Sequence, residues 1–159
     1  MLDRSETGHA TVPVPEGIDD VAAHEAPPVI AFPGGLPGFP GATRFVLRRA
    51  DRPFDAMLVM QSAEDPDIRF LMLPCNGKAE PLLAADLEAA CAVHGLASHQ
   101  VAVLLVVSRQ PAEEETGLGA RLCANLRAPV LIDTTSGIAV QHVLDSPNYP
   151  LRYPLQQAA

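Results

Sequence analysis

The chain has 159 residues, of which 48% are hydrophobic, so one domain with a sizeable core is expected. It carries 19 acidic and 11 basic residues, and a formal net charge of −8 disfavours direct binding to nucleic acid. Taken alone, this charge is explained best by solubility, and a basic protein partner is the other interpretation. Three cysteines without CxxC spacing, a polar start with no signal-peptide pattern, and no apolar run long enough to cross a bilayer predict a cytoplasmic protein without membrane contact.

Residues 1–27 differ in composition from the rest of the chain. They hold six acids and one base, a net charge of −5, together with proline, alanine, glycine and few large apolar groups. We therefore expect a flexible acidic segment, with a possible edge strand at residues 11–14. The globular domain is predicted to span residues 28–155, followed by a disordered tail at residues 156–159.

The first half of the domain reads as short strands separated by turns. In the second of them Phe45 and Leu47 alternate with Arg44, Val46 and Arg48, which is the period of a half-buried strand. Pro74 is expected to end the fourth strand, and the close spacing of the third and fourth indicates an antiparallel hairpin. The four predicted strands are 29–32, 43–49, 56–62 and 68–73.

The one predicted helix covers residues 81–96. Its apolar positions recur at steps of three and four residues, and Gly95 stands where a C-terminal cap belongs. The residues expected on its buried face are Leu83, Leu87, Ala90, Cys91 and His94.

The second half returns to strands, at 100–109, 130–133 and 138–143, and residues 121–126 suit either a helix or a strand, of which a strand is expected. The first of these is the most apolar, so it is expected to be central and buried. An acidic loop follows it at 110–119, a turn ending in Gly137 joins the last two, and the proline-rich residues from Asp145 onward are expected to be irregular. Seven or eight short strands with one short helix predict a mainly β fold, a small antiparallel β-barrel-like domain.

Motifs that would carry chemistry are missing. The five histidines are dispersed, and neither HExxH nor GxSxG occurs. Cys91 is expected to be a buried structural thiol, and the hydroxyl of Ser136 to satisfy backbone groups in its turn. Three consecutive acids, Glu113, Glu114 and Glu115, are typical of a solvated loop. We predict no catalytic residue, cofactor or metal, and hence a binding protein.

Four stretches, in the same order, resemble one family. "FPGGLPGF" (Phe32 to Phe39), "MQSAEDPDIRF" (Met60 to Phe70), "ANLRAPVLID" (Ala124 to Asp133) and "YPLRYPL" (Tyr149 to Leu155) are similar to motifs of the flagellar assembly factor FliW. The resemblance covers about residues 28–155. It implies a compact β-barrel-like fold and a cytoplasmic protein without enzymatic activity, which is monomeric when free.

The resemblance also implies two protein partners. Members of the FliW family bind flagellin before export, and they bind CsrA, an RNA-binding regulator that represses flagellin translation. The capture of CsrA relieves that repression without occupying the RNA site. This sequence departs from the family pattern in its long N-terminal segment, in Asp55-Ala56 after Pro53-Phe54, in "PCNGKAEPLL" with Lys78, and in Asp133.

Candidate partner-binding residues follow from the matched motifs and from side-chain type. Phe32 and Phe39 are interpreted as apolar plugs of the barrel end, whereas Leu36 is left open between plug and docking patch. Tyr149 and Arg152 suit an interface hot spot or a clamp on the tail equally well. Asn125 and Gln61 are expected to bond to the backbone. The partner-binding residues named are Leu36, Pro37, Phe39, Asp65, Glu113, Glu114, Glu115, Tyr149, Arg152 and Tyr153.

Two other functions stay open from the sequence. A flavin-binding split barrel would need a basic phosphate site, for which only Arg44, Arg48, Arg49 and Arg52 are available. Arg44 and Arg48 are expected to lie on a solvated strand face instead. The third possibility is a flagellin chaperone without a regulatory role.

Overall fold

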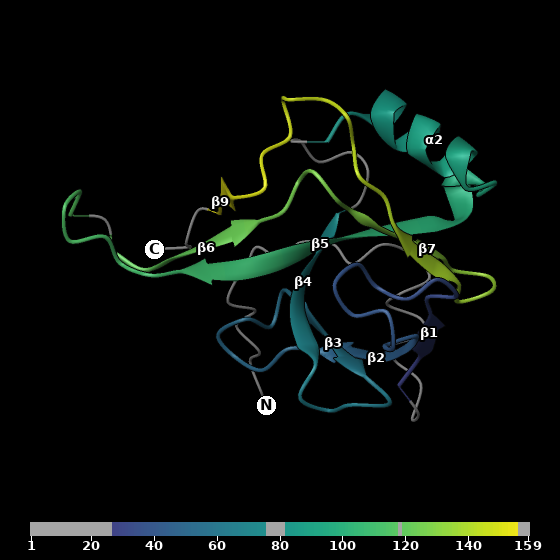
Figure 1. The fold of residues 1–159 in the computed structure, drawn as a ribbon, viewed down its shortest axis with the longest axis horizontal. Helices are drawn as coiled ribbons and strands as arrows, with labels where there is room; N and C mark the ends of the chain where they lie inside the picture. The colour runs from purple at the N-terminus through teal and green to yellow at the C-terminus, as the bar shows by residue number, and fades with distance from the viewer. Residues whose placement is uncertain (1–26, 76–81, 118, 156–159) are drawn as a thin grey trace, which may run out of the picture.

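The computed structural model describes residues 27–75, 82–117 and 119–155. Within them nine strands form a single sheet, accompanied by one α-helix and a short 3-10 helix (Figure 1). The elements are β1 (Val29–Ala31), β2 (Arg44–Arg49), β3 (Leu58–Ser62), β4 (Arg69–Cys75), α2 (Ala84–Val93), η1 (Ser98–Gln100), β5 (Val101–Gln110), β6 (Arg121–Ala124), β7 (Val130–Asp133), β8 (Ala139–Gln141) and β9 (Tyr153–Pro154).

Strands β1 to β5 follow one another as antiparallel neighbours in the sheet. The register of β2 against β3 places Phe45 opposite Ser62 and Leu47 opposite Met60. Phe45, Leu47 and Met60 are all buried, so the predicted alternation of β2 and the predicted β3–β4 hairpin are confirmed. The period of two therefore decides which face of this half of the sheet lines the barrel.

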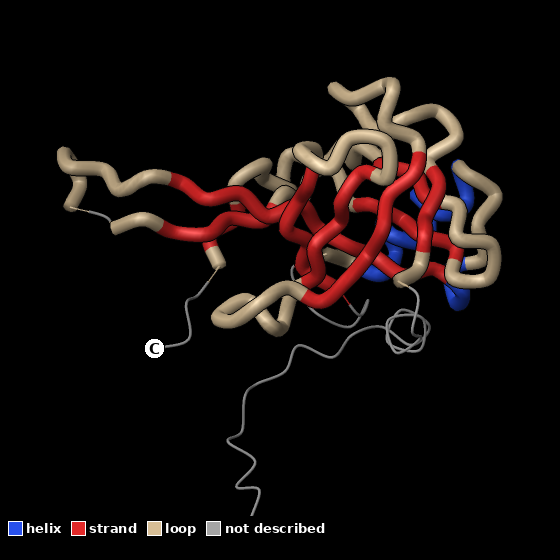
Figure 2. The backbone as a smooth tube through the Cα atoms, turned by 90° about the horizontal axis from the view of Figure 1, so that it is seen from below, coloured by secondary structure: helices blue, strands red, loops and turns tan. Residues whose placement is uncertain are grey.

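Strand β5 is the longest strand and pairs with three others. One of its edges carries β4, whereas the other carries β7 along Val101–Leu104 and β6 along Val107–Gln110. Because β7 and β6 diverge, the far half of β5 leaves the barrel together with β6 as a projecting hairpin (Figure 2). We call residues 108–123 the acidic arm. Its base is widened by β9, which pairs with β6.

The barrel is closed by a contact between β1 and the β7–β8 turn. Ala31 and Ile138 form a parallel bridge, and the Ala31 N–H donates to the carbonyl oxygen of Gly137 at 2.9 Å. Gly137 has a φ of 75°, as the predicted hairpin turn requires. The ring β1–β2–β3–β4–β5–β7–β8 is thus almost complete, and the predicted mainly β, barrel-like fold class is confirmed.

Two hydrophobic clusters share β5. The side chains of Ala102 and Leu104 point into the barrel with Phe32, Phe45 and Met60, and we call this the barrel cluster. Val103 and Leu105 point to the opposite face, where α2 and the chain around Tyr149 cover them, and we call this the helix cluster. Alternation along one strand therefore holds both cores together.

Several boundaries differ from those expected. Pro74 does not end β4, because it lies opposite Leu104 as a buried residue within the strand. The helix begins at Ala84 with Leu83 as its N-cap residue. Leu87, Ala90 and Cys91 are buried as expected, whereas Leu83 and His94, also expected on the buried face, are exposed. The chain after Asp145 contains the strand β9, which was not predicted. The possible strand at residues 11–14 and the tail at 156–159 lie outside the described residues.

Candidate partner-binding surfaces

The proline- and glycine-rich loop at residues 32–42 holds a fixed shape. The N–H groups of Gly35, Phe39 and Ala42 donate to backbone carbonyls within the loop at 2.7–3.0 Å. Gly35 has a φ of 75°, and a Cβ there would lie 2.6 Å from the carbonyl oxygen of Pro40. Only glycine suits both conditions, so this loop presents its side chains with little freedom.

The apolar side chains of this loop divide between the core and the surface. Phe32 is 1% exposed and packs edge-on against Phe45, with ring centroids 5.4 Å apart, so the plug interpretation is confirmed for Phe32. Leu36, left open by the sequence, is 4% exposed and belongs to the barrel cluster. Phe39 is 38% exposed, so the plug interpretation is wrong for this residue.

Phe39 lies on the surface beside a second aromatic ring. Its ring packs against that of Phe70 in β4 at 5.5 Å, and Phe70 in turn contacts the buried Phe45. Pro37 is exposed next to Phe39. We call Pro37, Phe39 and Phe70 the aromatic face. Sequence reasoning missed Phe70, although its place on a period-two strand next to a turn was visible.

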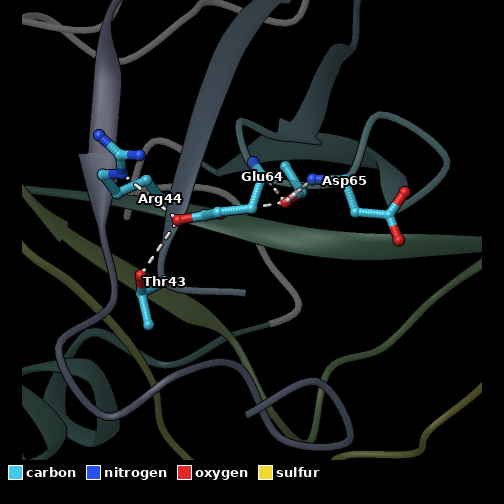
Figure 3. Close-up of polar contacts among 5 residues, drawn as sticks. Thr43, Arg44, Glu64 and Asp65 are labelled. Carbon is cyan, nitrogen blue, oxygen red and sulfur yellow. Dashed lines mark hydrogen bonds and ion pairs between the residues drawn. The ribbon is translucent and has the colours of Figure 1, made fainter. Parts of the chain in front are cut away.

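A turn that follows β3 lies beside this loop. The Ser62 hydroxyl accepts from the N–H groups of Glu64 and Asp65, while the carboxylate of Glu64 accepts from Thr43 and Arg44 (Figure 3). Burial would raise the pKa of Glu64, but the bond from Arg44 and the other hydrogen bonds lower it below its ordinary value. Thr43 follows the rigid loop directly, so Glu64 ties the two segments together.

Asp65 points away from this network. Figure 3 shows its carboxylate directed away from Glu64 and Arg44, its side chain is exposed, and its Oδ1 accepts from the N–H of Asp67 at 3.0 Å. Asp65 therefore shapes its own turn and still presents charge to solvent. Its expected role in partner binding stays a prediction.

The three consecutive acids lie at the tip of the acidic arm. Glu113, Glu114 and Glu115 are exposed, and Glu113 accepts from the hydroxyl of Thr116 at 3.0 Å. Arg121 at the start of β6 approaches Glu113 at 3.9 Å, an exposed ion pair of small energetic value. The arm thus carries concentrated negative charge away from the barrel (Figure 1).

The structure shows the clamp role for Tyr149, whereas partner binding by Arg152 and Tyr153 stays a prediction. Tyr149 is 3% exposed; its hydroxyl donates to the carboxylate of Asp86 and accepts from the N–H of Leu83 at 3.3 Å. Burial and the bond to Asp86 raise the pKa of Tyr149. Tyr149 therefore fixes the N-terminus of α2 to the C-terminal chain, whereas Arg152 and Tyr153 are exposed at the base of the arm.

The remaining polar residues behave as structural groups. Asn125 Oδ1 accepts from the N–H groups of Arg127 and Ala128, as expected. Gln61 donates to the backbone carbonyl of Pro66, as expected, but its side-chain oxygen accepts from the Arg48 side chain instead of from the backbone. The hydroxyl of Ser136 accepts from the N–H of Ile138 at 3.2 Å.

The described residues contain no group of three or more metal-ligating side chains. Two histidines do meet: His94 at the end of α2 and His142 after β8 have ring nitrogens 2.9 Å apart. Burial raises the pKa of the Cys91 thiol, so it is not activated as a nucleophile. No helix in the described part of the chain is long and apolar enough to cross a membrane.

Comparisons with known proteins agree on one family. The family model described as FliW protein matches residues 19–155. The flagellar assembly factor FliW of Azoarcus sp. (strain BH72) is 32% identical over 117 residues, covering 74% of this chain and 80% of that protein. The flagellar assembly factor FliW of Carboxydothermus hydrogenoformans is 34% identical over 135 residues, with 80% and 78% covered.

A solved structure supports the same architecture. The crystal structure of the flagellar assembly factor FliW superposes with a TM-score of 0.55, at 21% sequence identity, and covers 79% of this chain and 84% of that one. At this low sequence identity, the match is evidence for the fold alone. It agrees with the barrel-like sheet and single helix of the described residues.

Proposed function

Because the chain belongs to the FliW family, we propose that it is a flagellar assembly factor that works in the cytoplasm by binding flagellin and CsrA. The family match over residues 19–155 is the observation that carries the proposal. In this account the protein holds flagellin before export. Once flagellin leaves the cell, the freed protein captures CsrA and relieves the repression of flagellin translation.

The described surfaces suit binding rather than chemistry. The aromatic face offers the exposed ring of Phe39 on a rigid loop, backed by the half-buried ring of Phe70, and aromatic residues are enriched where binding energy concentrates. The acidic arm offers charge at a distance from the barrel. Rigid presentation lowers the entropy that is lost on association, which favours specific protein partners.

The acidic arm supplies a physical route to RNA release. CsrA must present positive charge to hold RNA, and an acidic arm docked beside that charge repels phosphates within about one Debye length, roughly 8 Å at physiological ionic strength. Glu113, Glu114 and Glu115 need not contact the RNA site to do so. Because their side chains are exposed, they remain available for this repulsion.

Co-purification tests the proposal as a whole. The protein is tagged in its own cells, and the proteins that come down with it are identified by mass spectrometry. Recovery of both flagellin and CsrA supports the proposal. Flagellin alone indicates a chaperone without a regulatory role, and a yellow, flavin-containing preparation would indicate the cofactor-binding alternative.

Charge reversal tests the role of the arm. The variant Glu113→Lys, Glu114→Lys, Glu115→Lys should lose RNA release from CsrA more strongly than it loses CsrA docking, measured by RNA competition and by calorimetry. The matched control reverses three exposed acids elsewhere, Asp51, Asp55 and Glu88, and should leave RNA release intact. Equal losses in release and docking would contradict the electrostatic mechanism.

A further inference from the structure

The outer face of the β1–β4 sheet is basic, although the chain is acidic. The inward side chains of β2 and β3 enter the barrel cluster, so their neighbours along each strand point outward. The register places Val46 between Val29 and Gln61, and Gln61 opposite Arg69. We call the outward residues the arginine face: Arg44, Val46, Arg48, Val59, Gln61, Arg69 and Leu71.

Among the described residues, only Arg44 of this face has a carboxylate partner. Arg44 pairs with Glu64 at 3.3 Å, with 63% of the Arg44 side chain exposed, and Arg48 donates to the neutral amide of Gln61 at 2.7 Å. Within the described part of the chain, neither Arg48 nor Arg69 has a carboxylate partner within ion-pair distance. Half-buried Val46 and Val59 lie between the arginines, so the face is both basic and apolar.

The described elements leave this face uncovered. The helix α2 packs on the helix cluster, which contains no residue of β1, β2 or β3. Figure 1 shows α2 beside β5 and β7, on the far side of the molecule from β2 and β3. An exposed face of arginine and aliphatic groups suits a chain that alternates acids with aliphatic residues.

Such a chain is attached directly to the sheet. Residues 1–26 carry six acids against Arg4, and aliphatic residues are interspersed among the acids. They lead through Pro27 and Pro28 into β1, whose Val29 lies opposite Val46 of the arginine face. The acids are Asp3, Glu6, Glu16, Asp19, Asp20 and Glu25, and the aliphatic residues after position 10 include Val12, Val14, Ile18 and Val21.

Distance and tethering favour contact. A random coil of 26 residues would span about 25–30 Å root-mean-square, whereas β4 lies only about 15 Å from β1 at ordinary strand spacing. A tether this short gives an effective local concentration in the millimolar range. The family model begins to match at residue 19, so most of the segment lies outside the family's common domain.

We propose that the acidic segment of residues 1–26 docks in cis on the arginine face. The segment neutralises Arg48 and Arg69 and buries its aliphatic residues against Val46 and Val59. It thereby shields this basic sheet face from other polyanions. This inference concerns the chain alone and does not depend on flagellin or CsrA.

Paramagnetic relaxation in the full chain tests the contact. The native cysteines at 75, 91 and 123 are all buried, so a nitroxide on the variant Ser5→Cys or Ala22→Cys labels the segment selectively. We expect loss of amide signal for β2 and β3, including Val46 and Gln61, in low salt. The loss should be reversed by about 0.5 M salt, where screening shortens to a few ångströms.

Charge reversal identifies the docking face. The double variant Arg48→Glu, Arg69→Glu should abolish the signal loss at Val46 and Gln61. The matched control, Arg109→Glu with Arg152→Glu, reverses two exposed arginines away from the face and should leave the signal loss unchanged. Signal loss that is absent, lies on the acidic arm, or survives in the double variant would overturn the proposal.

Heparin supplies an independent measurement. Neutralising the segment with Glu16→Gln, Asp19→Asn, Asp20→Asn and Glu25→Gln should uncover the arginine face, so elution from a heparin column should shift to higher salt. Adding Arg48→Glu and Arg69→Glu to this variant should remove the shift. Equal elution of the original and neutralised chains would count against the proposal.

Discussion

At the residue scale, backbone geometry and hydrogen-bonding capacity were easier to predict than exposure. Asn125 and Ser136 bond as their types suggest, and Gly137 adopts the positive φ that its turn needs. Phe32 and Phe39, by contrast, come from one loop and look alike in sequence, yet only Phe32 is buried. Their difference depends on Phe45 and Phe70, which approach from strands that the sequence cannot place.

Gly35 offers a sharp test of the rigid loop. The substitution Gly35→Ala forces a Cβ into a left-handed residue and against the carbonyl of Pro40, so it should cost about 2 kcal/mol or more of unfolding free energy. Urea denaturation followed by circular dichroism measures the cost. Gly34→Ala is the control, because a Cβ there meets nothing within 4 Å. Equal effects at both positions would contradict the assigned strain.

Tyr149 tests the clamp between the C-terminal chain and α2. Removing the hydroxyl in Tyr149→Phe leaves Asp86 and the Leu83 N–H without their partner, so unfolding free energy should fall by about 1–3 kcal/mol. Thermal or urea unfolding measures the change. Tyr153→Phe removes an exposed hydroxyl and should be nearly neutral. A neutral Tyr149→Phe would show that the clamp contributes nothing.

At the element scale, the sequence predicted whether a segment is helix or strand better than it predicted where that element begins and ends. Hydrophobic period identified β2, β5 and the helix, because alternation and three-to-four spacing reflect burial directly. Pro74 was wrongly expected to end β4. A proline interrupts a strand only where the sheet needs the backbone N–H that proline lacks. The short strand β9 owes its existence to pairing with β6, a contact between segments about 30 residues apart.

The end of α2 should respond to pH through its histidine contact. Burial and the neighbouring His94 lower the pKa of His142, against a raising effect of Asp145. Because this pKa is lowered in the folded protein, the unfolded chain binds the proton more readily than the folded chain does. The contribution of His142 to the free energy of unfolding is therefore fully present above about pH 6.5, the ordinary pKa of histidine, and declines as the pH falls below it. Unfolding free energies measured at pH 7.5 and pH 5.5 should show this decline.

Variants separate this histidine from other acid-sensitive groups. His142→Gln should flatten the decline between pH 7.5 and 5.5, whereas His99→Gln on the exposed turn η1 should not. The lowered pKa values of Glu64 and Asp133 act in a different window, since their contribution is lost only below their ordinary values of 4.5 and 3.8. A decline that persists unchanged in His142→Gln would exclude the histidine pair as its cause.

At the scale of the whole molecule, the sequence predicted a barrel but not its two-sided core. Strand β5 reads as a continuous apolar run, which indicates burial on both faces without saying what covers each. The structure places the barrel on one face and α2 with the C-terminal chain on the other. The sequence did not predict the acidic arm either, because the arm arises where β6 and β7 diverge along one edge of β5.

Sharing β5 should make the molecule unfold as one unit. Leu104→Ala creates a cavity in the barrel cluster and Leu105→Ala creates one in the helix cluster, and each should cost about 2–5 kcal/mol. Amide hydrogen exchange can follow both clusters, with Met60 reporting on the first and Ala90 on the second. Because neither core survives without β5, either substitution should accelerate exchange at Met60 and Ala90 together. If Leu105→Ala accelerated exchange at Ala90 alone, the helix cluster would be an independent unit, and the barrel would fold without it.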